Sequence, residues 1–378
     1  MRRSTDEHRR RLNETFEALC KIESPSGRER VCADWVTSEL RSLGLEVEED
    51  DAGSHVGSDS GNLLSRIVGG SDESILLCAH LDTVPLTAPV EPVLVDGGWE
   101  NANEAILGAD NKSAVAILVE LARRLASQPP IVGVELLFTV SEEVSLRGSR
   151  AFDAGRLRSR FGYVFDHATP IGEIVLASPS HQRLIAEMRG RSAHAGVRPE
   201  AGRSAIAAAA RAIAAMRLGR LDDETTANVG TIAGGTSINV VPERCRVEAE
   251  VRGLDEDKLQ AAMTDMIDSL QDAANASECD LDVTVERMFE GYRTRARAPE
   301  VELAEQALRA CGYEPKHIAT GGASDANALN AAGFACTNLA DGTERNHQPD
   351  ERISVDALEG MLDVAIALVE EAPGVLAQ

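Results

Sequence analysis

The order of apolar and polar positions divides the chain into alternating helices and strands. Apolar residues recur at helical spacing over residues 7–23, and a second helix extends to about Leu43. The run VGVELLFTV (132–140) is nearly continuous in apolar residues, which is typical of a strand buried on both faces of a parallel sheet. Further elements are predicted as strands at 62–67, 74–78 and 161–165 and as a long helix at 108–127. Residues 74–140 therefore predict a strand, a crossover helix and a second strand.

The pattern changes near residue 178, where a region of a different kind begins. Residues 183–190 alternate between apolar and polar side chains, as in a half-exposed strand. An alanine-rich helix, two strands, a helix and a strand follow, at 201–216, 227–233, 244–252, 255–275 and 281–287. This order is ferredoxin-like. The first pattern then resumes with a helix at 299–311, a strand at 334–338 and a helix at 355–371. We therefore predict an α/β domain in two parts, 1–178 and 293–378, interrupted by an inserted ferredoxin-like α+β domain at 179–292.

Composition limits the binding partners and the cellular compartment that we expect for this protein. The formal net charge is −24, which argues against binding to nucleic acid or to an anionic membrane. No apolar run approaches ~18 residues, so we expect no membrane span. The basic N-terminal stretch lacks an apolar segment behind it and does not read as a secretory signal. The seven cysteines form no CxxC pair, which predicts a reduced, cytoplasmic protein.

Two adjacent carboxylates, Glu142 and Glu143, directly follow the buried strand 132–140. Such pairs are common on solvated loops, but the carboxyl ends of parallel strands are where ligands bind in open α/β sheets. Other ionisable residues also stand at predicted strand ends or in adjoining loops: His80, Asp82, Asp110, Asp166 and His347. Acids and imidazoles gathered at one sheet edge repel one another without a cation, and two divalent metals remove that conflict. The ligand types suit zinc, with cobalt or manganese as alternatives.

Seven motifs carry a resemblance to a known family. They are AHLDTVP (79–85), GADNK (108–112), SEEV (141–144), SAHAG (192–196), GGTSINVVPE (234–243), GGASDAN (321–327) and NHQPDE (346–351). In this order, over about residues 10–370, the chain resembles the dinuclear zinc exopeptidases of the aminoacylase and carboxypeptidase group, and most closely their peptidase T-like branch. The resemblance implies a zinc-exopeptidase (phosphorylase/hydrolase-like) α/β/α catalytic domain, with the inserted domain as a lid.

The resemblance implies a ligand set for two zinc ions. His80 and Asp166 would hold one ion, Glu143 and His347 the other, and Asp110 would bridge both. Many relatives have two acids where this chain has Asp110 followed by an asparagine. We expect that asparagine to lie beyond the ligands, so that metal binding survives.

The resemblance also implies catalytic roles. Glu142 would be the general base, Asp82 would orient His80, and His194 of the lid would steady the developing oxyanion, from the other subunit in dimeric relatives. Adjacent strand residues point in opposite directions, so we expect Glu143 to face a metal while Glu142 faces the substrate water. Weaker resemblances imply substrate contacts at Asn239, Arg252, Gly321, Gly322, Ser324 and Asp325.

These features predict a cytoplasmic metallopeptidase that cleaves an amide bond in short peptides. The expected substrates are di- and tripeptides from which an aminopeptidase would release the N-terminal residue. An N-acyl amino acid deacylase uses the same site, and the sequence barely separates the two. A binding protein that has lost catalysis is disfavoured, because a mere binder does not need Glu142. A homodimer through the lid is the expected assembly, and a nucleotide-binding enzyme is disfavoured because no glycine-rich phosphate loop follows a strand.

Overall fold

The computed structural model describes residues 3–377, which form two compact units. One unit is made of the chain up to Ala177 and from Arg293 onward, and the other is Ser178–Tyr292. Each unit has a hydrophobic core of its own. Among the described residues, no helix is both long and apolar enough to cross a membrane.

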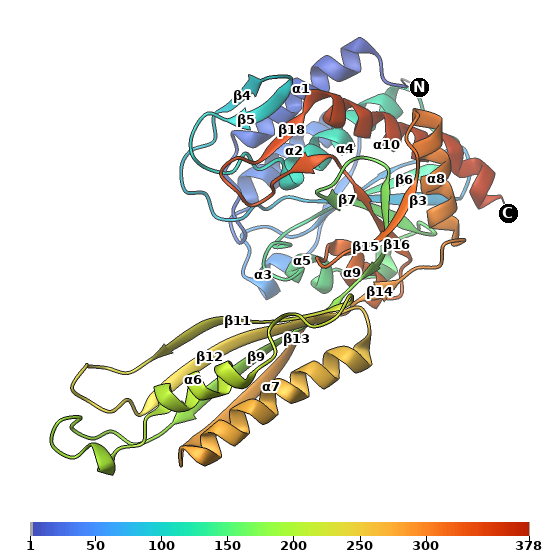
Figure 1. Ribbon diagram of the computed structural model, residues 1–378. Helices are drawn as coiled ribbons and strands as arrows, with labels where there is room; N and C mark the ends of the chain where they lie inside the picture. The colour runs from blue at the N-terminus through green and yellow to red at the C-terminus, as the bar shows by residue number, and fades with distance from the viewer. Residues whose placement is uncertain (1–2, 378) are drawn as a thin grey trace. The chain divides into compact units, whose positions relative to one another are not determined.

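The first unit is built on a nine-stranded sheet with the path β1-β2-β6-β3-β7-β16-β8-β14, and β15 pairs with β8 (Figure 1). Four neighbouring strands run parallel at its centre: β6 (Gly133–Thr139), β3 (Ser74–His80), β7 (Gly162–His167) and β16 (Cys336–Ala340). The remaining strands are β1 (Val47–Glu49), β2 (Leu63–Ile67), β8 (Glu173–Ser178), β14 (Tyr292–Arg293) and β15 (Lys316–Ala319). Every residue of β6 is buried, as the apolar run 132–140 predicted, and every residue of β3 is buried as well.

Helices cover both faces of this sheet. On one face, α4 (Ala109–Ser127) contacts β3 and β7 and is itself packed by α1 (Asp6–Cys20), α2 (Arg30–Ser42) and α10 (Val355–Leu376), while α8 (Pro299–Cys311) packs on α10. Leu77 and Ala79 of β3 belong to the core on this side. The intervening Cys78 points the other way, toward Asp325 of α9 (Asp325–Ala331). The predicted α/β/α arrangement is therefore confirmed.

Several short elements were not predicted. The polar segment at 50–61 contains the five-residue helix α3 (Ala52–Val56), and α5 (Arg147–Ala151) follows β6. Residues 86–107, for which the sequence predicted no element, hold the hairpin β4 (Pro92–Val95) and β5 (Gly98–Asn101). This hairpin joins β18 (Arg352–Ser354) and β17 (Thr343–Glu344) in a small sheet. Its strands have four residues or fewer, too few for a hydrophobic period to show in the sequence.

The second unit is a five-stranded antiparallel sheet in the order β10-β11-β12-β9-β13. Its strands are β9 (Ser180–Arg189), β10 (Gly219–Arg220), β11 (Thr225–Gly234), β12 (Arg244–Gly253) and β13 (Asp280–Phe289). Helices α6 (Ala205–Ala215) and α7 (Glu256–Ala276) pack together over the sheet and enclose the core. Apart from the short β10, the element order is the predicted ferredoxin-like one, and we call this unit the lid.

Candidate active site

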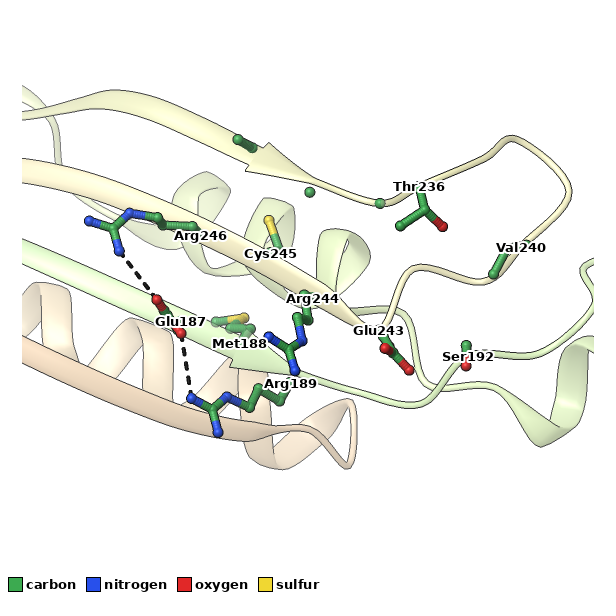
Figure 2. Close-up of a pocket in the computed structure, with 13 residues that line it drawn as sticks. Glu187, Met188, Arg189, Ser192, Thr236, Val240, Glu243, Arg244, Cys245 and Arg246 are labelled. Carbon is green, nitrogen blue, oxygen red and sulfur yellow. Dashed lines mark hydrogen bonds and ion pairs between the residues drawn. The ribbon is translucent and has the colours of Figure 1, made fainter.

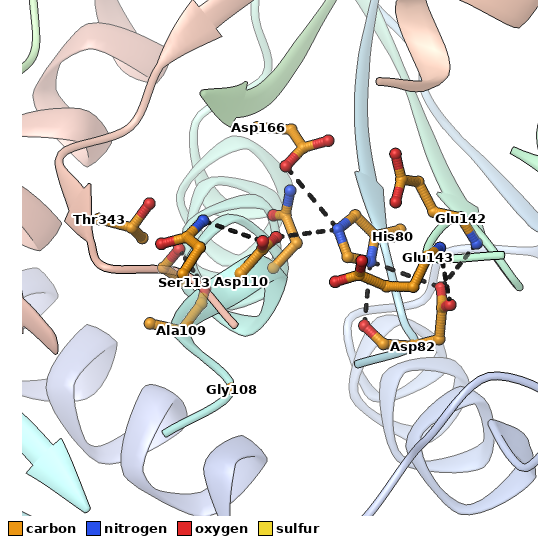
Figure 3. Close-up of polar contacts among 12 residues, drawn as sticks. His80, Asp82, Gly108, Ala109, Asp110, Ser113, Glu142, Glu143, Asp166 and Thr343 are labelled. Atoms are coloured by element: carbon orange, nitrogen blue, oxygen red, sulfur yellow. Dashed lines mark hydrogen bonds and ion pairs between the residues drawn. The ribbon is translucent and has the colours of Figure 1, made fainter. Parts of the chain in front are cut away.

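The ionisable residues predicted at strand ends gather at the carboxyl edge of the central parallel strands. His80 is the last residue of β3, Asp166 lies near the end of β7, and Glu142 and Glu143 follow β6. Figure 3 shows His80 and Asp166 beside Asp110, which lies at the start of α4, with Glu142 on the other side of His80. This is the edge at which open α/β sheets bind ligands.

Asp110 lies between two groups of side chains. Its Oδ1 is 3.1 Å from His80 Nε2, and its Oδ2 is 3.2 Å from His347 Nε2. On the first side, His80 Nε2 is also 3.8 Å from an oxygen of Asp166. On the second side, His347 Nε2 is 2.9 Å from an oxygen of Glu143. The two oxygens of one carboxylate thus face two different histidines, an arrangement suited to a carboxylate shared by two cations.

The donor atoms fit divalent metal ions. In three groups, the ligand atoms all lie within 4.8 Å of one another: His80 with Asp110 and Asp166, His80 with Glu142 and Glu143, and Asp110 with Glu143 and His347. Imidazole nitrogen and carboxylate oxygen are ligands that zinc, cobalt and manganese accept. The first and third groups share only Asp110, so the chemistry of the donor set suits a pair of ions.

Burial and close charged neighbours shift the pKa values of the side chains in this site. Burial raises the pKa of Asp166 and of Glu142 well above their ordinary values, and it also raises the pKa of Glu143. Hydrogen bonds to Asp110 and Glu143 raise the pKa of His347 to about 10. Burial opposes the charged form of His80, but its carboxylate partners prevail and raise its pKa well above the usual range. Without a cation, the cluster therefore retains protons that isolated side chains would have released at neutral pH.

His80 is oriented by the segment that follows it. The Nδ1 atom of His80 is 2.9 Å from the backbone oxygen of Asp82 and 3.4 Å from its carboxylate. Donation from Nδ1–H to this oxygen orients the ring and directs Nε2 toward Asp110. The predicted proximity of Asp82 and His80 is thus present, with the backbone oxygen as the nearer partner.

The expected explanation for the Glu142–Glu143 pair was wrong in one respect. Strand β6 ends at Thr139, so the two acids do not alternate on a strand. They lie in a turn that begins at Ser141, whose φ is +55°. The carboxylate of Asp82 accepts the backbone N–H of Glu142 at 3.0 Å and that of Glu143 at 3.1 Å. The turn, rather than the pleat of a strand, therefore sets the directions of the two side chains.

Two buried carboxylates that were not predicted from the sequence accept backbone N–H groups of segments next to the site. Glu351 is 1% exposed and accepts the backbone N–H groups of Gly108 and Asp110 at 2.8 and 2.9 Å. Asp341, just after β16, accepts the N–H and hydroxyl of Thr343, and its burial raises its pKa to about 7. Burial likewise raises the pKa of Glu351 to about 7. The only sequence signal for Glu351 was its place in the NHQPDE motif.

The asparagine after Asp110 is bound to the backbone of β7. The side-chain amide of Asn111 donates to the backbone oxygen of Phe165 at 2.8 Å, which ties the start of α4 to β7. The expectation that Asn111 lies beyond the ligands stays a prediction.

The predicted substrate contacts of the first unit differ in their surroundings. Gly321 and Gly322 are exposed in the loop after β15. Ser324 is buried and caps α9. Asp325 is fully buried, and its carboxylate accepts the hydroxyl of Thr139, the strand residue paired with His80. The burial of Asp325 argues against direct contact with a substrate, because the side chain supports the ends of β3 and β6.

The predicted lid residues fall into two places within the lid. His194 and Asn239 lie together, because the Ala195 N–H donates to the Asn239 backbone oxygen and His194 forms an isolated β-bridge with Val240. Arg252 pairs in register with His181, near the opposite end of the sheet. Arg252 lies eight positions along β12 from Arg244, which corresponds to about 27 Å of strand.

A cavity of about 460 Å³ lies beside the His194 and Asn239 loops (Figure 2). Its lining includes Ser192 and Val240, which flank those loops, and Glu187, which pairs with both Arg189 and Arg246. Its charged side chains thus neutralise one another in part.

Comparisons with known proteins identify the family. The chain matches the peptidase dimerisation domain of the M20 peptidases over residues 180–278 and the Peptidase family M28 model over residues 62–195. An uncharacterised Bacillus subtilis protein, YqjE, is 34% identical over 365 residues, covering 96% of this chain and 98% of that protein. The crystal structure of aminopeptidase PepT from Bacillus cereus is 35% identical, with a TM-score of 0.88 over 97% of this chain and 99% of that chain. This chain belongs to the M20 metallopeptidases, in their peptidase T-like branch.

A second solved structure supports the same assignment. A tripeptidase from Staphylococcus aureus is 30% identical to this peptidase, with a TM-score of 0.92 over 98% of this chain and 99% of that chain. The family predicted from the motifs is therefore confirmed, and the inserted unit of this M20 peptidase corresponds to the dimerisation domain.

The raised pKa values predict how the metal-free peptidase responds to pH. Burial raises the pKa of Asp341 and Glu351 to about 7, so the folded groups hold their protons up to about pH 7, whereas in the unfolded chain they release them near pH 3.8 and 4.5. The contribution of His347 is complete below its unfolded value of 6.5 and is lost as the pH rises toward about 10. Both effects lower the free energy of unfolding as pH rises. The lowered pKa of Asp110 acts only at acidic pH, below this window.

We therefore expect EDTA-treated protein to lose thermal stability steadily between pH 5 and pH 8. Added zinc should restore stability, and its effect should grow with pH because metal competes with protons for the same groups. Melting temperatures measured across this range, with and without zinc, test the prediction. Metal-free protein that becomes more stable toward pH 8 would contradict it.

Proposed function

We propose that this peptidase is an aminopeptidase that uses two divalent metal ions to release the N-terminal residue of di- and tripeptides. Zinc is the first candidate metal, with cobalt or manganese as alternatives. The observation that carries the proposal is the Asp110 carboxylate placed between His80 and His347. The 35% identity to the Bacillus cereus aminopeptidase and the 30% identity to the tripeptidase support the substrate class. The seven free cysteines favour the cytoplasm, where thiols stay reduced.

Five residues would hold the two ions. His80 and Asp166 would bind one ion, Glu143 and His347 the other, and Asp110 would contribute one oxygen to each. When bound, such an ion pair polarises a carbonyl and lowers the pKa of water. Bound cations would also stabilise the ionised carboxylates, because they compensate the negative charges that burial disfavours. The geometry that supports this assignment is the approach of each histidine to a different oxygen of Asp110.

Glu142 would be the general base. Its side chain is 8% exposed, so it is shielded from bulk water yet still accessible at the edge of the site. Its ligand atom lies within 4.8 Å of those of His80 and Glu143, and it belongs to neither group that contains Asp110. Glu142 would take a proton from the attacking water and pass it to the leaving amine, while its neighbour Glu143 binds metal.

His194 would donate a hydrogen bond to the oxyanion that forms on the scissile carbonyl. The backbone N–H of Gly196 donates to His194 Nδ1 at 3.2 Å. Because Nδ1 accepts, the neutral ring carries its proton on Nε2, which is then the donor. Asn239, held beside His194, would contact the substrate from the same loops, and the exposed backbone at Gly321 and Gly322 would face its carboxylate.

Two copies of the peptidase would associate through the lid. Strand β10 pairs only with Thr226 and Ala227 of β11. Within residues 3–377, the rest of that edge has no further strand beside it, and Ile232 on it is 48% exposed. Open strand edges pair readily with another chain, and the family match to a dimerisation domain supports this use.

Light scattering should therefore give about twice the chain mass of 40.3 kDa. Ile232→Lys, which places a charge on the edge, should shift the protein toward the monomer. Val68→Lys changes an 83% exposed residue of the other unit and should leave the mass unchanged. A monomeric wild type at micromolar concentration would contradict the proposed dimer.

Hydrolysis of a small substrate panel tests the proposed activity. Di- and tripeptides with free amines, their N-acetyl forms and an EDTA control would be compared after metal reconstitution. We expect metal-dependent cleavage of the free-amine peptides, with release of the N-terminal residue. Cleavage of the acylated forms alone would instead identify a deacylase. Absence of all cleavage in metal-loaded protein would contradict the proposed function.

A further inference from the structure

The segment SPSGRE (24–29) has no role in the proposed chemistry, yet it lies directly behind the site. Ser24 is bound to the segment after β3 by two hydrogen bonds. Its hydroxyl donates to the Leu81 backbone oxygen at 2.8 Å, and its backbone oxygen accepts the Thr83 N–H at 2.9 Å. The Ser26 hydroxyl donates to a carboxylate oxygen of Asp82 at 2.6 Å. This segment thus supports the residue that orients His80.

The same segment ends in a carboxylate that has no contact with solvent. Glu29 is 0% exposed. Its Oε1 accepts the N–H and the hydroxyl of Ser141 at 3.0 and 3.1 Å, and also the Gly27 N–H at 2.9 Å. Its Oε2 accepts the hydroxyl of Ser58 at 2.6 Å. Glu29 therefore joins three segments that are distant in the sequence.

The turn held by Glu29 has an unusual backbone. Ser141 has a φ of +55°, a conformation that costs free energy for any residue other than glycine. Such a conformation persists when the surroundings fix it. The contacts that fix it here are Glu29 at Ser141 and Asp82 at the next two N–H groups. Both carboxylates hold the stretch that carries Glu142 and Glu143.

We propose that Glu29 is a positioning residue that holds the Ser141–Glu143 turn, and so places both the general base and a metal ligand. The roles of Glu142 and Glu143 in this inference rest on the proposed function. Glu29 acts through the turn and does not touch the metals or the substrate. Loss of such supporting hydrogen bonds typically lowers metal affinity or activity by about 10- to 100-fold.

Glu29→Ala tests this role, and Glu135→Ala is its matched control. Glu135 is also a buried glutamate, 2% exposed, and it accepts the backbone N–H groups of Arg158 and Ser159 at 2.8 and 2.7 Å. It belongs to β6, the strand that leads to the Glu142 turn, but it lies near the other end. Both variants lose a buried carboxylate with backbone partners, and only Glu29→Ala loses contact with the turn.

Two readouts separate positioning from a general loss of stability. The first is zinc binding to metal-free protein, measured in competition with a chromophoric chelator. The second is the separation of kcat from KM on a tripeptide. For Glu29→Ala we expect the affinity of the weaker of the two zinc sites to fall about 10- to 100-fold. We expect kcat to fall by the same factor, with KM little changed. Glu135→Ala should melt at a lower temperature with both readouts unchanged.

Equal values for the folded Glu29→Ala and Glu135→Ala proteins, in both readouts, would overturn the proposal. If the wild type cleaves no peptide, the proposed function fails, and zinc binding alone decides the role of Glu29. The two failures are therefore distinguishable.

If Glu29→Ala does not fold, two milder variants test the same proposal. Glu29→Gln retains an oxygen that can accept from Ser141, so it should keep most of the wild-type zinc affinity and kcat. Ser58→Ala removes the hydrogen bond to Oε2, together with the one that the Ser58 hydroxyl accepts from the Ser60 N–H, and should lower both about threefold. An unchanged Ser58→Ala protein, or a Glu29→Gln protein with a loss of 10-fold or more, would contradict the hydrogen-bond account.

Discussion

The structure depends on the concentration of carboxylates and imidazoles at one edge of a parallel sheet. Burial disfavours their charged forms and raises the pKa of Asp166 and Glu142. The arrangement persists in the fold because each histidine faces a carboxylate, with Asp110 between the two. Cations at the same positions would satisfy these charges more completely than protons do. The cost of burying the acids is thus what makes the site receptive to metal.

Supporting hydrogen bonds give the site its geometry. Asp82, Glu29 and Glu351 are each buried, and each accepts backbone N–H groups of a segment that carries candidate ligands or the candidate base. Asp82 and Glu29 hold the turn after β6, and Glu351 holds the start of α4. Loops at the ends of strands would otherwise have considerable freedom. Buried acceptors at their backbones convert them into a rigid frame on which side chains are placed.

The sequence predicted what depends on local patterns, and it could not predict what depends on distant contacts. The apolar run 132–140 identified β6, and the acids at strand ends identified the cluster, because parallel strands bring their carboxyl ends to one edge. The hydrogen bond between Glu29 and Ser141 joins residues 112 positions apart, and no local sequence pattern predicts it. The positive φ of Ser141 was equally hidden, since serine carries no signal for it.

The central claim is that Glu142 moves protons in a two-metal site rather than binding metal itself. Its most direct test is Glu142→Gln, assayed for bound zinc and for turnover of a tripeptide that the wild type cleaves. The amide keeps the shape of the side chain but cannot accept a proton at neutral pH. We predict two zinc ions per chain, as in the wild type, with turnover lowered by at least ~100-fold. Near-normal turnover would contradict the account, as would the loss of a zinc ion together with activity.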